Sequence, residues 1–418
     1  MKYNIAVYRL FASNFVWAFL AEALGKASVL FANIYFAKTL LPASYGVFSV
    51  AFSLTVYIAL LLEVGSSVHG TREVSRATSE QLSDIVNPII TVRFFVGLLL
   101  FFSINTLMFF GTFSDEYKHV FMIFSFYILA MSLTTEWVFR GLQRYAYIAV
   151  GNFLLIAVVF SSFLFVSDSS DVLRAAIAIV VAYLLNSFVL FIILKGRLLP
   201  LLRMTCSTNQ ALLVYRSSIK FLLSGIFGMG YLLVPSIALV SIYGSYDAGI
   251  FNAFFRPVVS LCGLLHFIPM VVFPMMSKYD KTDKQSFEVI HGVLVWSVAL
   301  MATLSSVILL LSGGYFTVTF LGAAYAGEIH VLNLLILIIP VFALKNSMLI
   351  PLISVGDYSS QVNAALAAFV VSVVVGIPLI YWLSSTGAAM SIFLSELLSC
   401  VVVYHAYRRL KADGWTMS

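Results

Sequence analysis

The stretch Leu10–Phe36 (LFASNFVWAFLAEALGKASVLFANIYF) is long enough to cross a bilayer, and it carries Glu22 and Lys26 in its middle. A crossing takes about 20 mostly apolar residues. A charge near the bilayer centre costs roughly 2.5–3.5 kcal/mol on insertion scales, so such residues usually face protein or water. At about 100° per residue, Glu22, Lys26 and Asn33 fall within about 40° of one another. We therefore predict a membrane helix with one polar face.

The composition indicates a polytopic membrane protein. The 418 residues are 61% hydrophobic and 10% charged, with a mean hydropathy of +1.03, whereas soluble domains have about 25% charged residues. Cys206, Cys262 and Cys400 form no CxxC motif, so we expect packing residues and no metal site. A cleaved leader ending at Ala21-Glu22-Ala23 is an alternative for the first segment, but apolar sequence continues beyond that point.

Apolar windows of about 20 residues predict an all-α protein with about twelve membrane-spanning helices. The predicted spans are 10–36, 44–64, 88–111, 118–138, 146–167, 172–194, 217–242, 248–276, 288–312, 328–352, 360–383 and 387–407. Prolines inside two of them predict kinks or partial unwinding. These prolines are Pro257, Pro269 and Pro274 in the eighth span and Pro340 in the tenth.

The distribution of lysine and arginine predicts the orientation. Seventeen of these residues lie on the side of the N-terminus and three on the opposite side. By the positive-inside rule, both termini are therefore expected in the cytoplasm. Four basic residues fall inside predicted spans: Lys26, Arg93, Arg256 and Lys345.

A basic connection divides the spans into two sets of six. We expect an N-terminal lobe over 1–194, a cytoplasmic linker over 195–216 and a C-terminal lobe over 217–418. An internal similarity supports this division, because Tyr45–Phe52 (YGVFSVAF) and Ala248–Phe255 (AGIFNAFF) share a glycine and two phenylalanines at a constant offset of 203 residues. Parallel repeats of this kind predict two six-helix lobes around a central cavity.

Several short motifs carry a family likeness. They are Tyr45-Gly46, Glu63-Val64-Gly65, Thr71-Arg72-Glu73, Glu136–Tyr145 (EWVFRGLQRY), Gly249–Ala253 (GIFNA), Phe320–Tyr325 (FLGAAY) and Gly356-Asp357-Tyr358. In their order and spacing, the chain resembles the O-antigen flippases of Wzx type. These belong to the polysaccharide-exporter branch of the multidrug/oligosaccharidyl-lipid/polysaccharide (MOP) exporter superfamily.

The resemblance implies a fold and a cargo. The fold would be that of the MATE transporters, alternating between states open to either side of the bacterial inner membrane. The cargo would be an undecaprenyl-diphosphate-linked oligosaccharide, moved from the cytoplasmic to the periplasmic leaflet. A polymerase and a chain-length regulator of the same pathway are expected partners, and nucleic acid is not. We expect no cofactor apart from a coupling ion, H⁺ or Na⁺.

The basic residues within spans are candidates for binding the diphosphate or acidic sugars, because buried cations are suited to anions out of water. The predicted substrate-binding residues are Lys26, Arg93, Arg256, Lys345, Asn33 and Asn252. Alternatives remain for two of them. Lys26 could simply pair with Glu22 four residues earlier, and Arg93 could extend to the interface from a helix start.

Glu22 and Glu396 are the candidates for ion coupling, because the pKa of a carboxylate in a partly dry site rises toward neutrality. Glu22 as a static partner of Lys26 is the alternative for the first, and a packing role among serines is the alternative for the second. Glu63 and Glu136 lie near predicted helix ends, where we expect them to brace loops.

Three other functions are possible for such a chain. A multidrug or cation exporter of the same superfamily is disfavoured because cationic residues repel cationic cargo. A lipid II flippase is a closer rival, for which the resemblance would imply fourteen helices. An enzyme, such as a membrane-embedded polysaccharide polymerase or ligase, is disfavoured because external connections are short, and we expect no catalytic residue. Gly25-Lys26 lacks the flanking residues of a nucleotide-binding loop.

Overall fold

The structure, a computed structural model, describes residues 2–63, 70–78, 80–198, 208–279 and 284–412, and these contain helices and no strand. The α-helices are α1 Lys2–Glu63, α2 Thr71–Arg76, α3 Leu82–Phe110, α4 Asp115–Leu133, α5 Glu136–Gly141, α6 Tyr145–Ser162, α7 Val172–Ile193, α8 Thr208–Ile242, α9 Ser245–Tyr279, α10 Lys284–Phe316, α11 Ile329–Ile336, α12 Ile338–Ser354, α13 Tyr358–Val371 and α14 Ile377–Ala412. Four further segments have other helix types: η2 Leu194–Leu198, η3 Thr317–Leu321 and η5 Ser372–Gly376 are π-helices, and η4 Ala323–Glu328 is a 3₁₀-helix.

The described residues contain ten helical stretches that are long and apolar enough to cross a membrane. Two of these, Val16–Leu62 with 47 residues and Tyr358–Ala412 with 55, are about twice the 20 or so residues that one crossing needs. Each contains one residue with non-helical angles, Leu41 (φ 62°, ψ 166°) and Ser384 (φ 50°, ψ −128°). Both lie in the connections predicted between spans, so dividing each stretch there gives the expected twelve crossings.

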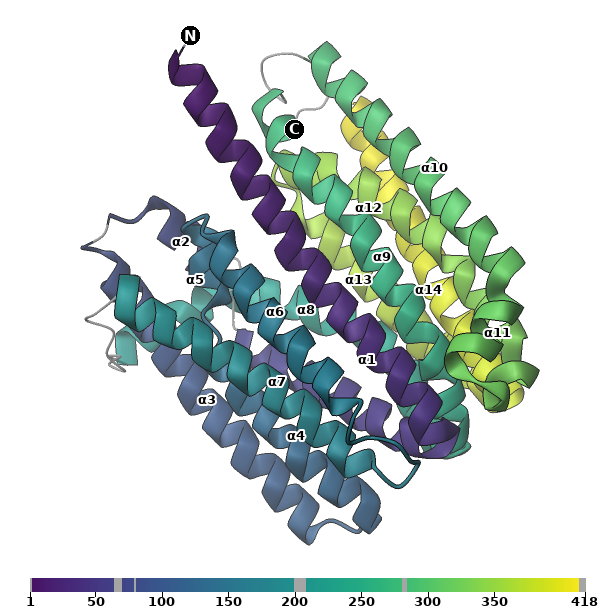
Figure 1. Ribbon diagram of the computed structural model, residues 1–418. Coiled ribbons are helices and arrows are strands. Elements are labelled where there is room, and N and C mark those ends of the chain that lie inside the picture. Colours follow the sequence, from purple (N-terminus) through teal and green to yellow (C-terminus); the bar gives the residue numbers. More distant parts are fainter. Residues whose placement is uncertain (1, 64–69, 79, 199–207, 280–283, 413–418) are drawn as a thin grey trace. The chain divides into compact units, whose positions relative to one another are not determined.

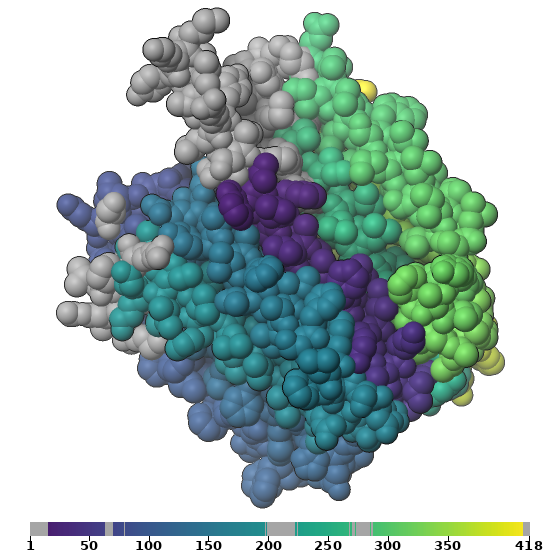
Figure 2. All heavy atoms as spheres, viewed as in Figure 1, coloured from purple at the N-terminus to yellow at the C-terminus, as the bar shows by residue number. Residues whose placement is uncertain are grey.

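Helix α10 has an exposed face of large apolar side chains. Its large apolar side chains at Val289, Val293, Trp296, Leu300 and Leu304 are exposed, and their spacing of three or four residues places them on one face. The helix carries much of the exposed green surface in Figure 2. An apolar face of this length suits contact with lipid, so the chain is an integral multi-pass membrane protein.

The chain forms two compact units. Unit 1 comprises Met1–Ala32 and Val47–Leu223, and unit 2 comprises Asn33–Gly46 and Ser224–Ser418. Helix α1 therefore contributes to both units, which the expected division into 1–194 and 217–418 did not include. Of the expected linker, residues 199–207 lie outside the described residues, whereas Thr208 already begins α8. Within unit 1, α3, α4, α6 and α7 lie side by side (Figure 1).

The predicted proline effects differ between the two helices. Pro340 has no N–H to donate to the carbonyl of Ile336, and the helix is interrupted there, between α11 and α12. The hydroxyl of Ser306 donates to that Ile336 carbonyl at 3.5 Å. Helix α9, by contrast, remains helical from Ser245 to Tyr279. The partial unwinding given as one outcome at its three prolines is therefore not seen between Ser245 and Tyr279, and the other outcome, a kink, stays a prediction.

Within unit 2, the chain at the start of the first copy of the internal repeat packs closely against the chain at the start of the second copy. A Cβ added to Gly46 would lie 1.8 Å from the carbonyl oxygen of Ser245, and one added to Gly249 would lie 1.8 Å from that of Pro42. The contacts are reciprocal, since an offset of 203 relates Pro42 to Ser245 and Gly46 to Gly249. Reciprocity of this kind is what a two-fold relation between the copies requires. The backbones approach so closely that only glycine fits at either position.

We expect Gly249→Ala to lower the thermal unfolding midpoint in detergent sharply or to prevent accumulation of folded protein, because the new methyl group overlaps a backbone carbonyl that cannot move away alone. The matched control is Gly292→Ala on α10, where an added Cβ meets nothing within 4 Å. That change should be neutral or stabilise by about 0.5–1 kcal/mol. Equal midpoints for both variants would contradict the close packing.

Candidate functional site

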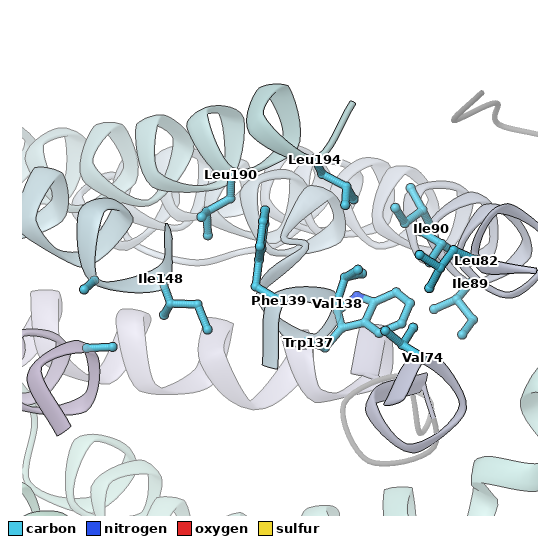
Figure 3. Close-up of a cluster of buried hydrophobic side chains, with 13 residues drawn as sticks. Val74, Leu82, Ile89, Ile90, Trp137, Val138, Phe139, Ile148, Leu190 and Leu194 are labelled. Atoms are coloured by element: carbon cyan, nitrogen blue, oxygen red, sulfur yellow. The ribbon is translucent and has the colours of Figure 1, made fainter. Parts of the chain in front are cut away.

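The short helix α5 is held in unit 1 by a cluster of buried apolar side chains. Trp137, Val138 and Phe139 are almost fully buried there, against residues of α2, α3, α6 and α7 (Figure 3). The hydroxyl of Thr71 also donates to the Trp137 carbonyl at 3.1 Å. Because three central residues of α5 are fixed in this way, the charged residues at either side of them, Glu136 and Arg140, have a defined position.

Four ionisable side chains meet between α1 and α5. The guanidinium of Arg140 contacts Glu136 Oε1 at 2.6 Å through Nη2 and 3.2 Å through Nε. Glu22 lies further from its partners, with Oε1 3.7 Å from Lys26 Nζ and Oε2 4.0 Å from Arg140 Nη2. Hydrogen bonds of this type are about 2.7–3.2 Å long. Glu22 and Lys26, which are 34% and 41% exposed, are therefore loosely paired, whereas Arg140 and Glu136 form a tight pair.

Two carboxamides connect three helices beside this group. Asn152 Nδ2, on α6, donates to the Ala21 carbonyl of α1 at 2.8 Å, and Asn186 Nδ2, on α7, donates to Asn152 Oδ1 at 3.4 Å. These side chains and the ionisable group line a cavity of about 200 Å³. Its main polar lining residues are Glu22, Lys26, Glu136, Arg140, Asn152, Tyr183 and Asn186. We call it the unit 1 cavity.

In unit 2, two predicted residues that are 223 positions apart meet directly. Arg256 Nη1 donates to Asn33 Oδ1 at 3.0 Å, and the hydroxyl of Tyr45 donates to the same oxygen at 3.0 Å. Asn252, one turn before Arg256, is fully buried, and its Oδ1 accepts from Ser236 at 3.0 Å. Asn252 is thus engaged in packing α8 against α9, whereas Arg256 is only partly buried.

Two other predicted residues of unit 2, Lys345 and Glu396, pair with each other. Lys345 Nζ, on α12, lies 2.6 Å from Glu396 Oε2, on α14, and the two side chains are 12% and 1% exposed. The hydroxyl of Tyr231 donates to the other carboxylate oxygen. The Lys345 ammonium also lies 5.1 Å from the centre of the Phe342 ring. Both carboxylate oxygens of Glu396 are therefore occupied by donors from other helices.

Arg93 has a different environment from the other predicted cations. It is 3% exposed, within α3, and its Nη2 donates to the Met131 carbonyl near the end of α4 at 2.6 Å. Met131 lies just before the break between α4 and α5, and its carbonyl also accepts from the N–H of Thr134 at 3.4 Å. Arg93 therefore joins α3 to the end of α4.

The structure brings the predicted residues together in pairs: Glu22 with Lys26, Asn33 with Arg256, and Lys345 with Glu396. Sequence reasoning missed the carboxamides Asn152 and Asn186, and it assigned Glu136 to a loop rather than to the cavity. A signal for the carboxamides exists, because both are polar residues inside apolar spans, where such residues usually face a protein interior. In the described residues there is no group of three His, Cys, Asp or Glu side chains placed to hold a metal.

Comparison with known structures defines the class of protein. The fold is that of lipid II flippase MurJ in an inward closed conformation, with a TM-score of 0.71, 14% identity and coverage of 95% of this chain and 87% of that one. It is also that of an inward-facing MATE multidrug resistance transporter of the MOP superfamily, with a TM-score of 0.69, 11% identity and coverage of 94% and 95%. The predicted all-α, MATE-like fold is confirmed.

Comparison of sequences defines the family. Residues 11–280 match the family described as polysaccharide biosynthesis protein, and the chain belongs to that family. An Escherichia coli (strain K12) protein named "Putative O-antigen transporter" is 23% identical over an alignment of 380 residues that covers 87% of this chain and 88% of that protein. A Shigella dysenteriae protein of the same name is 22% identical over an alignment of 360 residues that covers 84% of this chain and 88% of that protein. The resemblance seen in the sequence motifs is thereby confirmed.

The buried pair Lys345 and Glu396 generates a stability prediction. Lys345→Met or Glu396→Gln alone should each cost about 3–5 kcal/mol of unfolding free energy, because each leaves an unbalanced charge in a dry site. The double variant should cost less than the sum of the singles by about 0.5–3 kcal/mol. The free energy of unfolding of the three variants is measured by denaturation in mixed micelles. Glu328→Gln is the control, since its pair with His330 is exposed at 3.6 Å and worth little; additive single effects would contradict the pairing.

Proposed function

We propose that this chain is a flippase for a lipid-linked saccharide unit of polysaccharide biosynthesis. The observation that carries the proposal is the unit 1 cavity, in which ionisable and amide side chains of α1, α5, α6 and α7 meet within membrane-spanning helices. Polar side chains at that depth are expensive and mark substrate or ion pathways in membrane proteins. The membership of the chain in the polysaccharide biosynthesis family and the names of its relatives support this type of cargo.

The cargo in this proposal is an oligosaccharide on undecaprenyl diphosphate, moved from the cytoplasmic to the periplasmic leaflet by alternating access. The excess of lysine and arginine on the side of both termini supports a cytoplasmic location for them, and the bacterial relatives support the inner membrane. A polymerase and a chain-length regulator would receive the product. A MATE-type exporter or a lipid II flippase remains the alternative that the shared fold allows.

Arg256 is the residue that we assign to the diphosphate. Its side chain is partly buried, and the guanidinium donates to the amide oxygen of Asn33. A guanidinium offers a planar set of donors that matches phosphate oxygens. Asn33, held also by Tyr45, would orient the guanidinium toward the cargo.

Glu22 is the carboxylate that we assign to ion coupling by H⁺ or Na⁺. It has no contact shorter than 3.7 Å with its two cationic partners, so a proton could be added without breaking a short hydrogen bond. Glu396 differs, because Lys345 and Tyr231 already occupy both of its oxygens. The fixed ammonium stands where a coupling cation would bind, which favours a structural role for Glu396.

The proposed function is tested by a flipping assay in proteoliposomes with the native lipid-linked repeat. Wild-type protein should expose the repeat on the far leaflet, and protein-free vesicles should not. Arg256→Gln should lower the flipping rate by about 10- to 100-fold, since a charge-assisted hydrogen bond contributes about 1.5–3 kcal/mol. Arg409→Gln, an exposed change near the end of α14, is the control. Equal exposure of the repeat with and without protein would refute the flippase.

The coupling role is tested in the same vesicles with an imposed proton or sodium gradient. Glu22→Gln cannot be protonated, so flipping should continue at a rate that no longer responds to the gradient. The control Glu116→Gln, at the exposed start of α4, should keep the response. A Glu22→Gln protein that responds as wild type does would show that Glu22 is only a static partner of Lys26.

A further inference from the structure

The size of the unit 1 cavity limits what it can hold. Its volume is about 200 Å³, which is below the range of about 300–1,000 Å³ typical of sites for drug-sized ligands. This volume suits a single sugar ring better than a complete lipid-linked oligosaccharide.

The charge of the cavity is balanced. Two carboxylates, Glu22 and Glu136, face two cations, Lys26 and Arg140. The donors of Arg140 are directed at Glu136 at 2.6 Å and 3.2 Å. A diphosphate placed here would meet both carboxylates, and like charges in such a site are strongly unfavourable. The cavity is therefore unsuited to the anionic part of the cargo, in contrast to the sequence-based assignment of Lys26.

The lining instead combines donors and acceptors that are open to a neutral partner. Lys26 has an ammonium whose nearest carboxylate oxygen is 3.7 Å away, and Glu22 has oxygens at 3.7 Å and 4.0 Å from their cations. A hydroxyl group donates one hydrogen bond and accepts two. Sugar hydroxyls placed between Lys26 and Glu22 would therefore replace one long ionic contact with short charge-assisted hydrogen bonds.

Carboxamides and an aromatic ring complete the arrangement. Asn152 and Asn186 line the cavity, and Asn186 Nδ2 donates to Asn152 Oδ1 at 3.4 Å. Tyr183 lines the cavity and packs edge-on against Tyr127, with ring centres 4.8 Å apart and planes at 78°. An oriented aromatic ring beside a few placed polar groups is the usual composition of a small-molecule site.

We propose that the unit 1 cavity binds one neutral sugar ring of the cargo and does not bind the diphosphate. The proposal rests on the proposed function and deepens it, because it assigns the saccharide to residues of α1 and α7 in unit 1. Lys26 and Glu22 hold the ring hydroxyls. Tyr183 packs against the ring.

Saturation-transfer NMR on the full-length protein in nanodiscs tests this proposal. The probes are neutral methyl glycosides of glucose, galactose, mannose and N-acetylglucosamine, with inorganic diphosphate as competitor. At least one glycoside should receive saturation, and excess diphosphate should not displace it. Absence of saturation for all four glycosides, or their displacement by diphosphate, would overturn the proposal.

Variants locate the bound sugar. Lys26→Met should weaken glycoside binding about tenfold, the loss expected for hydrogen bonds to a charged group, and Lys118→Met on α4 is the matched control. Glu22→Gln keeps the shape of the side chain and should weaken binding in the same direction, which covers the case of a poorly folded Lys26→Met protein. Unchanged affinity in a folded Lys26→Met or Glu22→Gln protein would overturn the assignment to this cavity.

Failure of this proposal is distinguishable from failure of the flippase. Glycoside binding needs no lipid and no gradient, so it is measured whether or not the protein flips its cargo. Flipping without glycoside binding would remove the sugar site and leave the flippase. Glycoside binding without flipping would leave the sugar site and remove the proposed transport.

Discussion

The cost of a charge at membrane depth constrains the whole arrangement of polar residues in this protein. A buried ion leaves water at a penalty of several kcal/mol, which only close partners offset. Lys345 and Glu396 satisfy this requirement at 2.6 Å. Arg140 and Glu136 are also 2.6 Å apart, but these side chains are 45% and 29% exposed, so the penalty on them is smaller. Glu22 and Lys26 are 3.7 Å apart and are 34% and 41% exposed. A pair that tolerates this separation within a cavity has room for a third participant, which distinguishes it from the two tight pairs.

Polar residues of helix α1 lie in both units. Glu22 and Lys26 lie in the part of α1 that packs in unit 1, whereas Asn33 begins the part that packs in unit 2. The helical periodicity of the sequence places all three on one face, but it does not make them one site. Asn33 is committed to Arg256 and Tyr45, and Glu22 approaches Arg140. One polar helix face thus serves two groups of residues with different chemistry.

The membrane spans were predictable from the sequence because the bilayer imposes a length and an apolar composition on each of them. The interruption near Pro340 was also predictable, since a missing N–H is local chemistry. Ser384 also lies in a predicted connection between spans, but the hydrogen bond from its side chain to Asp247 of another helix was not predictable. The partners of the charged residues depend on how helices pack. Lys345 and Glu396 were given separate roles because 51 residues separate them, and only the packing of α12 against α14 shows that they neutralise each other.

The pairing of Lys345 with Glu396 changes the argument that basic residues in the membrane select the charge of the cargo. Four cations within the predicted spans suggested a lining that repels cationic compounds. In the structure, Lys345 is neutralised by Glu396, Lys26 faces Glu22, and Arg93 is buried against the end of α4. Arg256 donates to the uncharged amide of Asn33. The tight pairing of Lys345 and the burial of Arg93 therefore weaken the argument that the number of basic residues in the membrane decides the charge of the cargo.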